Sequence, residues 1–145
     1  MKKGFTLLEL LVVISIIGIL MAIGVVSFTT AQKKSRDSRR RGDMKAVQKA
    51  LEQCYSLDVE YPASITFGSD LDCATSTETV MELIPLDPKD SAPYEYTNYS
   101  YDAVNDKYCL CALLENTDAG NASAAGAGGS CTFATGDYFC VSNQQ

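Results

Sequence analysis

The sequence predicts an α+β fold, in which a long N-terminal helix is followed by a small antiparallel β-sheet. Three observations indicate it. Residues 5–28 form an apolar run, residues 29–57 continue without proline, and the later part of residues 58–145 alternates apolar and polar residues between turn signals. These segments are predicted to be a transmembrane assembly helix, its amphipathic continuation and a disulfide-rich globular head.

Residues 5–28 are long and apolar enough to cross a membrane. The run contains one charge, Glu9, and 24 helical residues at about 1.5 Å each reach about 36 Å, which exceeds a hydrocarbon layer of about 30 Å. A secretory signal has an apolar region of only about 7–15 residues, followed by a small-residue cleavage site. This run is longer and no such site follows it, so a membrane-spanning helix is predicted.

Glu9 needs a partner, because a carboxylate at this depth in lipid costs about 2.5–3.5 kcal/mol. Proteolysis between Gly4 and Phe5 would create an α-amino group one helical turn from Glu9. We expect this amine to pair with Glu9, either within one subunit or between neighbours staggered by a turn. A generic single-pass anchor explains the length of the run but explains neither Glu9 nor the Gly4–Phe5 junction.

The residues Lys2-Lys3-Gly4-Phe5-Thr6-Leu7-Leu8-Glu9 resemble the prepilin signature of type IV pilins and type II secretion pseudopilins. The resemblance implies that prepilin peptidase removes residues 1–4 as a leader peptide and that Phe5 is then N-methylated. It also implies that Glu9 guides assembly by pairing with the N-terminus of an adjacent copy. The close match covers roughly residues 1–60.

The same resemblance implies where the protein lies and what it meets. The N-terminus is expected in the cytoplasm and the head outside a bacterial inner membrane, where an assembly platform extracts the subunit into an extracellular pilus or a periplasmic pseudopilus. Many members of the family have a proline just past the middle of the span, where this chain has Val25 and Val26. Gly18 and Gly24 are then the expected soft points of the helix.

Charge is unevenly distributed along the chain. Residues 33–49 hold eight basic and two acidic residues, a net +6, whereas residues 50–145 hold two lysines and 15 acidic residues, a net −13. The basic flank suits anionic lipid head groups or the acidic heads of neighbouring copies. An acidic head repels phosphate, so direct binding to nucleic acid is not expected. The positive-inside rule would place this flank in the cytoplasm. Six cysteines indicate instead an oxidising compartment, and the resemblance implies the same, so we expect the flank and head to lie outside the cytoplasm.

The second half of the helix is predicted to be amphipathic. Three (i, i+4) ion pairs are expected on its solvated surface: Lys33/Asp37, Asp37/Arg41 and Arg39/Asp43. An apolar stripe follows that the head must cover, formed by Met44, Val47, Leu51, Cys54 and Tyr55.

The head is predicted to contain one short helix and three strands. Pro62 ends the long helix, residues 63–78 are a loop, and Thr79 with Glu82 fits a capping box for one helical turn through Ile84. Strands are expected at 94–102, with a bulge near Thr97 or Asn98, at 108–114 and at 137–142, separated by a turn at Asn105–Asp106 and an exposed loop at 118–130.

Six cysteines, at positions 54, 73, 109, 111, 131 and 140, allow 15 disulfide connectivities. Cys109 and Cys111 project from one strand face and cannot easily bridge each other, which leaves twelve. If Cys54 pairs with Cys73, then Cys109 and Cys111 take Cys131 and Cys140 in either order. The alternative, a thiolate zinc site, lacks Cys-x-x-Cys pairs and His ligands.

No enzyme and no obligatory cofactor are predicted. The chain has no His, which excludes Ser-His and Cys-His nucleophiles. Some secretion pseudopilins hold calcium in the sheet region, and this resemblance makes Asp87, Asp90, Asp102 and Asp118 candidate ligands, although no EF-hand spacing occurs. The alternative is a solvated acidic surface.

The sequence therefore predicts a structural subunit of a type IV pilus, which polymerises through its N-terminal helix into a filament for adhesion, motility or uptake. A major pseudopilin of a type II secretion system is the alternative within the family. An alternative of another class is a membrane-anchored extracellular binding domain that uses the hairpin tyrosines as a stacking platform; sheet core and subunit contact are the commoner roles of such tyrosines.

Overall fold

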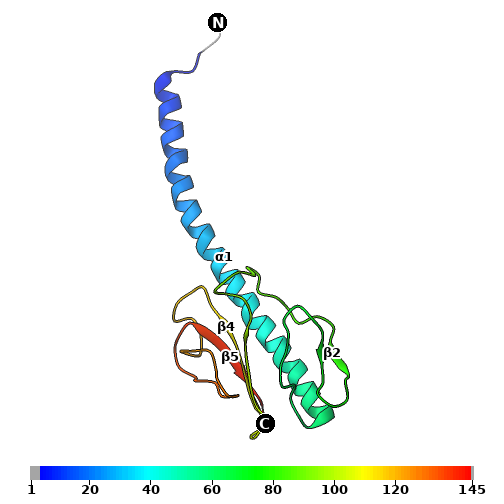
Figure 1. The fold of residues 1–145 in the computed structure, drawn as a ribbon. Coiled ribbons are helices and arrows are strands. Elements are labelled where there is room, and N and C mark those ends of the chain that lie inside the picture. Colours follow the sequence, from blue (N-terminus) through cyan, green and yellow to red (C-terminus); the bar gives the residue numbers. More distant parts are fainter. Residues whose placement is uncertain (1–3, 145) are drawn as a thin grey trace. The chain divides into compact units, whose positions relative to one another are not determined.

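A computed structural model describes residues 4–144, without the side chain of Val26. Its one helix in this range, α1 (Leu7–Asp58), is followed by five short strands, so the predicted α+β fold is confirmed (Figure 1). The chain forms two compact units whose boundary lies inside α1, between Lys34 and Ser35.

The predicted continuous helix is also confirmed, since α1 passes without a break through the end of the apolar run and ends one residue beyond Leu57. Val59, the residue after α1, has a φ of 58° and its N–H donates to the carbonyl of Tyr55 at 2.8 Å. A left-handed residue at this position is a common way to end a helix. Pro62 then lies beyond the stop, where its missing N–H costs nothing to the helix.

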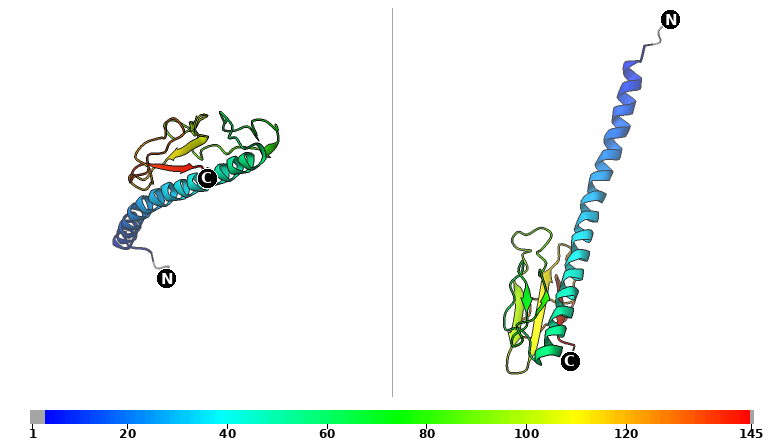
Figure 2. Two further views of the ribbon diagram at one scale, coloured as in Figure 1. Left: turned by 90° about the horizontal axis from the view of Figure 1, so that it is seen from below. Right: turned by 90° about the vertical axis from the view of Figure 1, so that its right-hand side faces the viewer.

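Three strands form the main sheet, in the order β3-β4-β5 and all antiparallel. They are β3 (Asn98–Asp102), β4 (Lys107–Leu113) and β5 (Tyr138–Ser142). The sheet and the small β1–β2 ladder lie along the second part of α1, within residues 35–144, and on the same side of it (Figures 1 and 2). The opposite side of this part of α1 faces solvent.

β4 is the centre of the head because both of its faces are buried. Successive side chains of a strand point to opposite faces. Tyr108, Leu110 and Ala112 therefore join the core against α1, while Cys109 and Cys111 point away from α1 into a second cluster with Ala122 and Cys140. One strand thus links the helix on one face to the C-terminal loop on the other.

The apolar stripe of α1 is covered by the head as predicted. Met44, Val47, Leu51 and Cys54 are fully buried, and Tyr55 packs at the margin of the same core. A polar network crosses this core, because the carboxylate of Glu52 accepts hydrogen bonds from the hydroxyls of Tyr61 at 3.1 Å and Tyr108 at 2.9 Å.

The predicted short helix at Thr79–Ile84 is wrong. Residues 79–81 form strand β2 (Thr79–Met81), which pairs antiparallel with β1 (Leu71–Asp72) inside the segment predicted to be a loop. The Thr79 hydroxyl does not cap a helix but donates across the ladder to Asp72 at 2.5 Å. A two-strand ladder satisfies these backbone groups without the cost of nucleating a single helical turn.

The first strand of the hairpin is shorter than predicted. β3 begins at Asn98, residues 94–96 form a bend and Thr97 is irregular, so the bulge near Thr97 or Asn98 is not needed. In a strand over 94–102 without a bulge, Tyr94 and Tyr96 would face the opposite side from Tyr99 and Tyr101. Only Tyr99 and Tyr101 belong to the strand, so no bulge is required. Tyr96 instead reaches α1, where its hydroxyl donates to Asp43 at 3.0 Å.

The loop at 118–130 is irregular but not wholly exposed. Ala122 is fully buried and forms isolated bridges to Phe133 and Tyr138. A Cβ on Gly126 would lie 2.2 Å from the sulfur of Cys109, so glycine is required where this loop crosses the sheet. Composition predicted a loop correctly but did not reveal that it packs.

We predict that the double substitution Cys54→Ala/Cys73→Ala lowers the free energy of unfolding by about 3 kcal/mol, because it releases the loop that joins the end of α1 to β1. All eight tyrosines lie beyond residue 54 and the chain has no Trp, so tyrosine emission of the micelle-bound full chain during guanidinium unfolding measures the head alone. The exposed substitution Ser56→Ala is the control, and equal midpoints for the two variants would contradict the prediction.

Candidate assembly and processing site

Gly4 and Phe5 lie just before α1 and are exposed. The Phe5 side chain is 84% exposed, and no heavy atom lies within 4 Å of the position that a Cβ on Gly4 would take. Nothing else in the described range therefore packs against the predicted cleavage junction. The rest of the predicted leader, residues 1–3, lies outside the described residues.

The first turn of α1 is closed by a reciprocal pair of side chains, Thr6 and Glu9. The Thr6 N–H and hydroxyl donate to the Glu9 carboxylate at 2.9 and 2.8 Å, and the Glu9 N–H donates to the Thr6 hydroxyl at 3.3 Å. This is a capping box, in which two otherwise unpaired N–H groups are satisfied by each other's side chains. The negative charge also lies at the positive end of the helix dipole.

Glu9 thus has a partner within its own chain that our sequence analysis missed. The signal was present, since Thr6-Leu7-Leu8-Glu9 has the Thr-x-x-Glu spacing of a capping box. The predicted partner, an α-amino group on Phe5, would be created one residue from Thr6. The cap therefore holds the carboxylate close to the place where this amine would appear.

The apolar side chains of the first unit are uncovered in the single chain. The most apolar window of α1 has a mean hydropathy of 2.9 and none of it is buried. Large exposed side chains surround the helix on all sides: Leu7, Leu8, Leu10, Leu11, Val12, Val13, Ile14, Ile16, Ile17, Ile19, Leu20, Met21, Ile23, Val25 and Phe28. A helix that is apolar all round requires lipid or other helices as its surroundings.

The polar groups within this run are satisfied by the helix itself. The hydroxyls of Ser15 and Ser27 donate to the carbonyls of Val12 at 2.8 Å and Ile23 at 3.3 Å. Such back-bonding lets a serine sit in a nonpolar environment. Gly18 and Gly24 lie within unbroken helix, and a Cβ at either would meet no atom within 4 Å.

A buried ion cluster fastens two head segments to the second half of α1. The fully buried Arg40 makes a two-pronged contact with Asp87, at 2.5 and 3.0 Å, and also pairs with Asp37 at 2.8 Å and Glu115 at 3.1 Å. Bidentate pairing of guanidinium with carboxylate gives both strength and a fixed orientation. The segments around Asp87 and Glu115 are thereby held against the helix.

The predicted solvated ion pairs of Asp37 are wrong for this reason. Asp37 is buried, and its carboxylate accepts hydrogen bonds from the backbone N–H groups of Glu115 and Asn116 at 2.8 and 3.0 Å. Of the three predicted (i, i+4) pairs, the structure shows Arg39 with Asp43, at 3.9 Å.

Glu115 is the electrostatic link between two arginines of α1. A two-pronged hydrogen bond from Arg36, at 2.5 and 2.7 Å, together with Arg40, lowers the pKa of Glu115 to about 2, against the opposing effect of burial. Because the pKa in the folded state lies below its ordinary value near 4.5, the cluster contributes fully to stability above that value. The contribution is lost as the pH falls toward 2.

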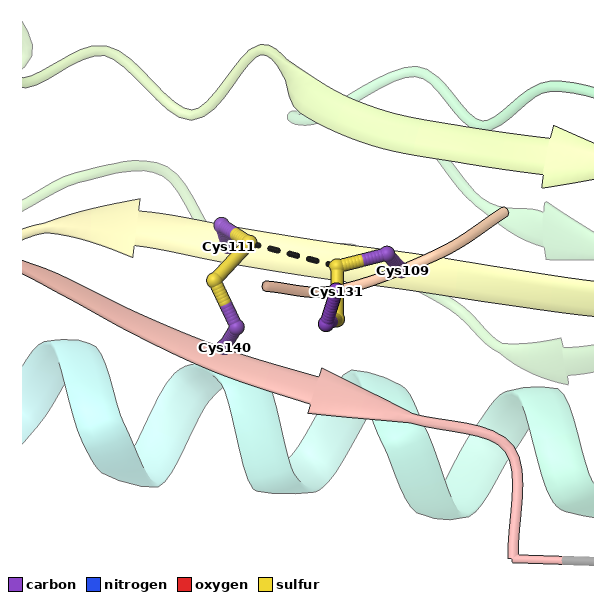
Figure 3. Close-up of side chains that lie close together, drawn as sticks. All are labelled: Cys109, Cys111, Cys131 and Cys140. Atoms are coloured by element: carbon purple, nitrogen blue, oxygen red, sulfur yellow. Dashed lines mark hydrogen bonds between the residues drawn. A yellow bond between two sulfur atoms is a disulfide. The ribbon is translucent and has the colours of Figure 1, made fainter. Parts of the chain in front are cut away.

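The six cysteines form three disulfides: Cys54–Cys73, Cys109–Cys131 and Cys111–Cys140. Figure 3 shows the second and third side by side, with the sulfurs of Cys109 and Cys111 3.4 Å apart on one face of β4. All four sulfurs lie within 4.8 Å of one another. Because they are bonded in pairs they are not thiolates, so in this state they offer no zinc site.

The structure does not gather the candidate calcium ligands into one site. Asp87 is engaged by Arg40, and Asp102 accepts hydrogen bonds from Val104 and Asn105 in the hairpin turn. Asp90 and Asp118 lie exposed in separate loops. Within residues 4–144 no three carboxylates lie close enough together to be identified as a group that could hold a metal ion.

The hairpin tyrosines belong to the core rather than to a stacking platform. Tyr108 is fully buried, its ring lies edge-on to that of Tyr61, and the hydroxyl of Tyr99 donates to the carbonyl of Pro62 at 2.6 Å. Burial, aided by a hydrogen bond to Asp106, raises the pKa of Tyr101 to about 12. These contacts favour the packing role over ligand binding.

The N-terminal segment matches known proteins. Residues 1–25 match the family model described as the prokaryotic N-terminal methylation motif. The chain therefore carries the N-terminal segment of the type IV pilin and type II secretion pseudopilin class, and the recognition made from the signature is confirmed.

Three curated relatives illustrate the similarity. The type IV major pilin protein PilA of Myxococcus xanthus is 41% identical over 55 residues, which cover 38% of this chain and 25% of the relative. The type IV major fimbrial protein FimA of Dichelobacter nodosus is 39% identical over 54 residues, 37% of this chain and 35% of the relative. The type II secretion system core protein G of Pseudomonas aeruginosa is 38% identical over 64 residues, 43% of this chain and 44% of the relative.

The chain thus spans less than half the length of each of these three relatives in the matched region. No solved structure is significantly similar to the chain. The similarity concerns the N-terminal segment, while the head is known from its own structure.

We predict that Arg40→Met lowers the free energy of unfolding by about 3–5 kcal/mol, because it leaves buried carboxylates without a cation. Arg39→Met is the matched control, since the Arg39 side chain is 63% exposed and its one ion pair within residues 4–144 is the 3.9 Å contact with Asp43. Its expected change is within about 0.5 kcal/mol. Guanidinium unfolding monitored by tyrosine emission compares the two, and similar losses would show that the cluster does not hold the head to α1.

Proposed function

We propose that this protein is a structural subunit of a type IV pilus, which polymerises through the apolar helix at residues 5–28. The observation that carries the proposal is an apolar helix surface that nothing else in residues 4–144 covers, together with a matching processing motif and a capped acidic residue in the first turn. The relatives named as major pilins and fimbrial proteins support it, because their similarity falls on this segment.

The proposed mechanism is physical rather than chemical. The helix is first held in the bacterial inner membrane with its N-terminus in the cytoplasm. After prepilin peptidase cleaves the Gly4–Phe5 bond and Phe5 is methylated, an inner-membrane platform moves the subunit into a filament. Burial of the helix among copies of itself then replaces lipid, so the apolar surface never meets water.

Glu9 makes this packing selective. In a nonpolar bundle an ionised carboxylate is costly unless it has a partner. The Thr6 cap supplies neutral hydrogen bonds but no positive charge. A neighbouring subunit that offers its α-amino group to the carboxylate supplies that charge, and a misplaced neighbour does not.

A pseudopilin of a type II secretion system is the second candidate. The similarity to core protein G extends over 64 residues and covers a larger share of that protein than of the pilins. In this case the filament would remain in the periplasm. A calcium ion held by loop carboxylates is proposed only for this candidate.

The proposal involves no enzymatic activity and no direct contact with nucleic acid. The three relatives described above are named as a pilin, a fimbrial protein and a secretion core protein. Residues 50–145 carry a net charge of −13, which repels phosphate.

Intact mass spectrometry of protein from its natural host tests the processing step. We expect a chain that begins at methylated Phe5 and is six hydrogens lighter than the fully reduced polypeptide, because three disulfides are closed. A chain that keeps Gly4, or begins after a conventional signal cleavage, would instead indicate a membrane-anchored binding domain.

We predict that Glu9→Gln lowers filament yield by about tenfold or more while leaving membrane insertion intact. Glutamine at this position still completes a capping box, so the substitution removes the charge that pairs with a neighbour and spares the cap. Thr6→Ala is the matched control, because it weakens the cap and keeps the charge. Filament yield is measured by shearing and electron microscopy, and insertion by membrane fractionation. A normal filament yield for Glu9→Gln, together with a loss for Thr6→Ala, would show that the cap and not the charge governs assembly.

A further inference from the structure

Several exposed charges of the second unit make no ion pair within residues 4–144. The ion pairs within residues 4–144 use the arginines at positions 36, 39 and 40 as their cations. Lys45 and Lys49 are exposed and make no ion pair in this range, and neither do the exposed acids Asp90 and Glu95. Both charge types therefore remain available to another molecule.

Lys45 and Lys49 lie one turn apart on α1, so both side chains project from one face of the helix. Gly42 and Ala46 lie on the same face, and both are small and exposed. A Cβ on Gly42 would meet nothing within 4 Å. Figure 2 shows that the head elements cover only one side of this part of α1. The two lysines, which we call the lysine pair, stand on a surface that another chain can approach closely.

The head carries a pocket of complementary chemistry. Its volume is about 420 Å³, its apolar part is formed by Ile65, Phe67, Leu86 and Tyr96, and its acidic residues are Asp90 and Glu95. The rings of Phe67 and Tyr96 lie 5.4 Å apart, and Tyr96 is anchored to α1 through Asp43. None of the residues lining this acidic pocket is basic.

We infer that the acidic pocket binds the lysine pair of a neighbouring copy of this chain, an inference that rests on the proposed function and adds the contact between heads. A lysine side chain suits the site because its alkyl stem packs on apolar surface while its ammonium group reaches a carboxylate. The pocket and the lysine pair are different surfaces of the same chain, so the contact is heterologous. A heterologous contact repeats without closing and produces an open helical assembly, as a filament requires.

Charge reversal with rescue tests the inference in full-length protein. We expect Asp90→Lys/Glu95→Lys and Lys45→Glu/Lys49→Glu each to lower filament yield by about tenfold or more, because like charges then face each other across the contact. The four-residue variant combining both changes is expected to recover to within about threefold of the parent. Glu78→Lys/Glu82→Lys, which reverses two exposed acids outside the pocket, is the matched control and is expected to leave the yield unchanged.

Failure of the combined variant to recover, or an equal loss in the control, would overturn the inference. Tyrosine emission during unfolding is compared among the variants, so that a folding defect is recognised. Zero-length carbodiimide cross-linking of filaments grown from mixed light and ¹⁵N-labelled subunits gives a second readout that needs no substitution. We expect mixed-isotope peptides joining Lys45 or Lys49 to Asp90 or Glu95.

The outcomes separate this inference from the proposed function. Parent protein that forms no filaments defeats the proposed function itself. Filaments that form without these cross-links, and that tolerate both charge reversals, defeat only the head contact. Parent filaments without these cross-links, together with loss of membrane association in Lys45→Glu/Lys49→Glu, would instead assign the lysines to anionic lipid.

Discussion

The structure depends on one constraint: the first part of α1 has apolar side chains that nothing else in residues 4–144 covers. At about 25 cal/mol per Å² of exposed apolar surface, such a helix cannot persist in water as a monomer. Three other features are consistent with a helix that needs lipid or other helices around it. The serines bond to the helix backbone, the end of the helix is capped by its own side chains, and the head covers only the part of α1 that follows.

The two parts of α1 have different surfaces and therefore pack differently. Up to the basic flank it is apolar all round, which suits lipid or a bundle of copies. Beyond Ser35 it has a narrow apolar stripe, and a buried arginine replaces additional apolar contacts as the means of fastening loops to it. Removing one partner from such a buried cluster is costly, because it leaves the remaining charges uncompensated. The head is therefore positioned by charge as well as by apolar burial.

Much of this architecture could be predicted from the sequence because it follows from the spacing of apolar residues and from residues that form turns. The apolar run, the stripe from Met44 to Tyr55, the hairpin turn at Asn105–Asp106 and the central strand all have clear local patterns. The prediction failed where contacts distant in the sequence decided the outcome. Thr79 has the local pattern of a helix start, but its partner is Asp72 across a ladder. Arg40 looks like one more basic surface residue, and only the fold brings Asp87 to it, 47 positions away. The Thr6–Glu9 cap is different, because its spacing was visible and was overlooked in favour of the signature containing it.

The two adjacent disulfides on β4 have a consequence for the durability of the head. The Ala-, Gly- and Ser-rich segment that follows β4 contains the kind of small, accessible residues that proteases prefer. A cut anywhere between residues 112 and 130 divides the chain into a piece that holds Cys109 and Cys111 and a piece that holds Cys131 and Cys140. Both bonds cross the cut. A chain cut in this loop would keep its C-terminal strand covalently attached, so a single cleavage there does not release the strand.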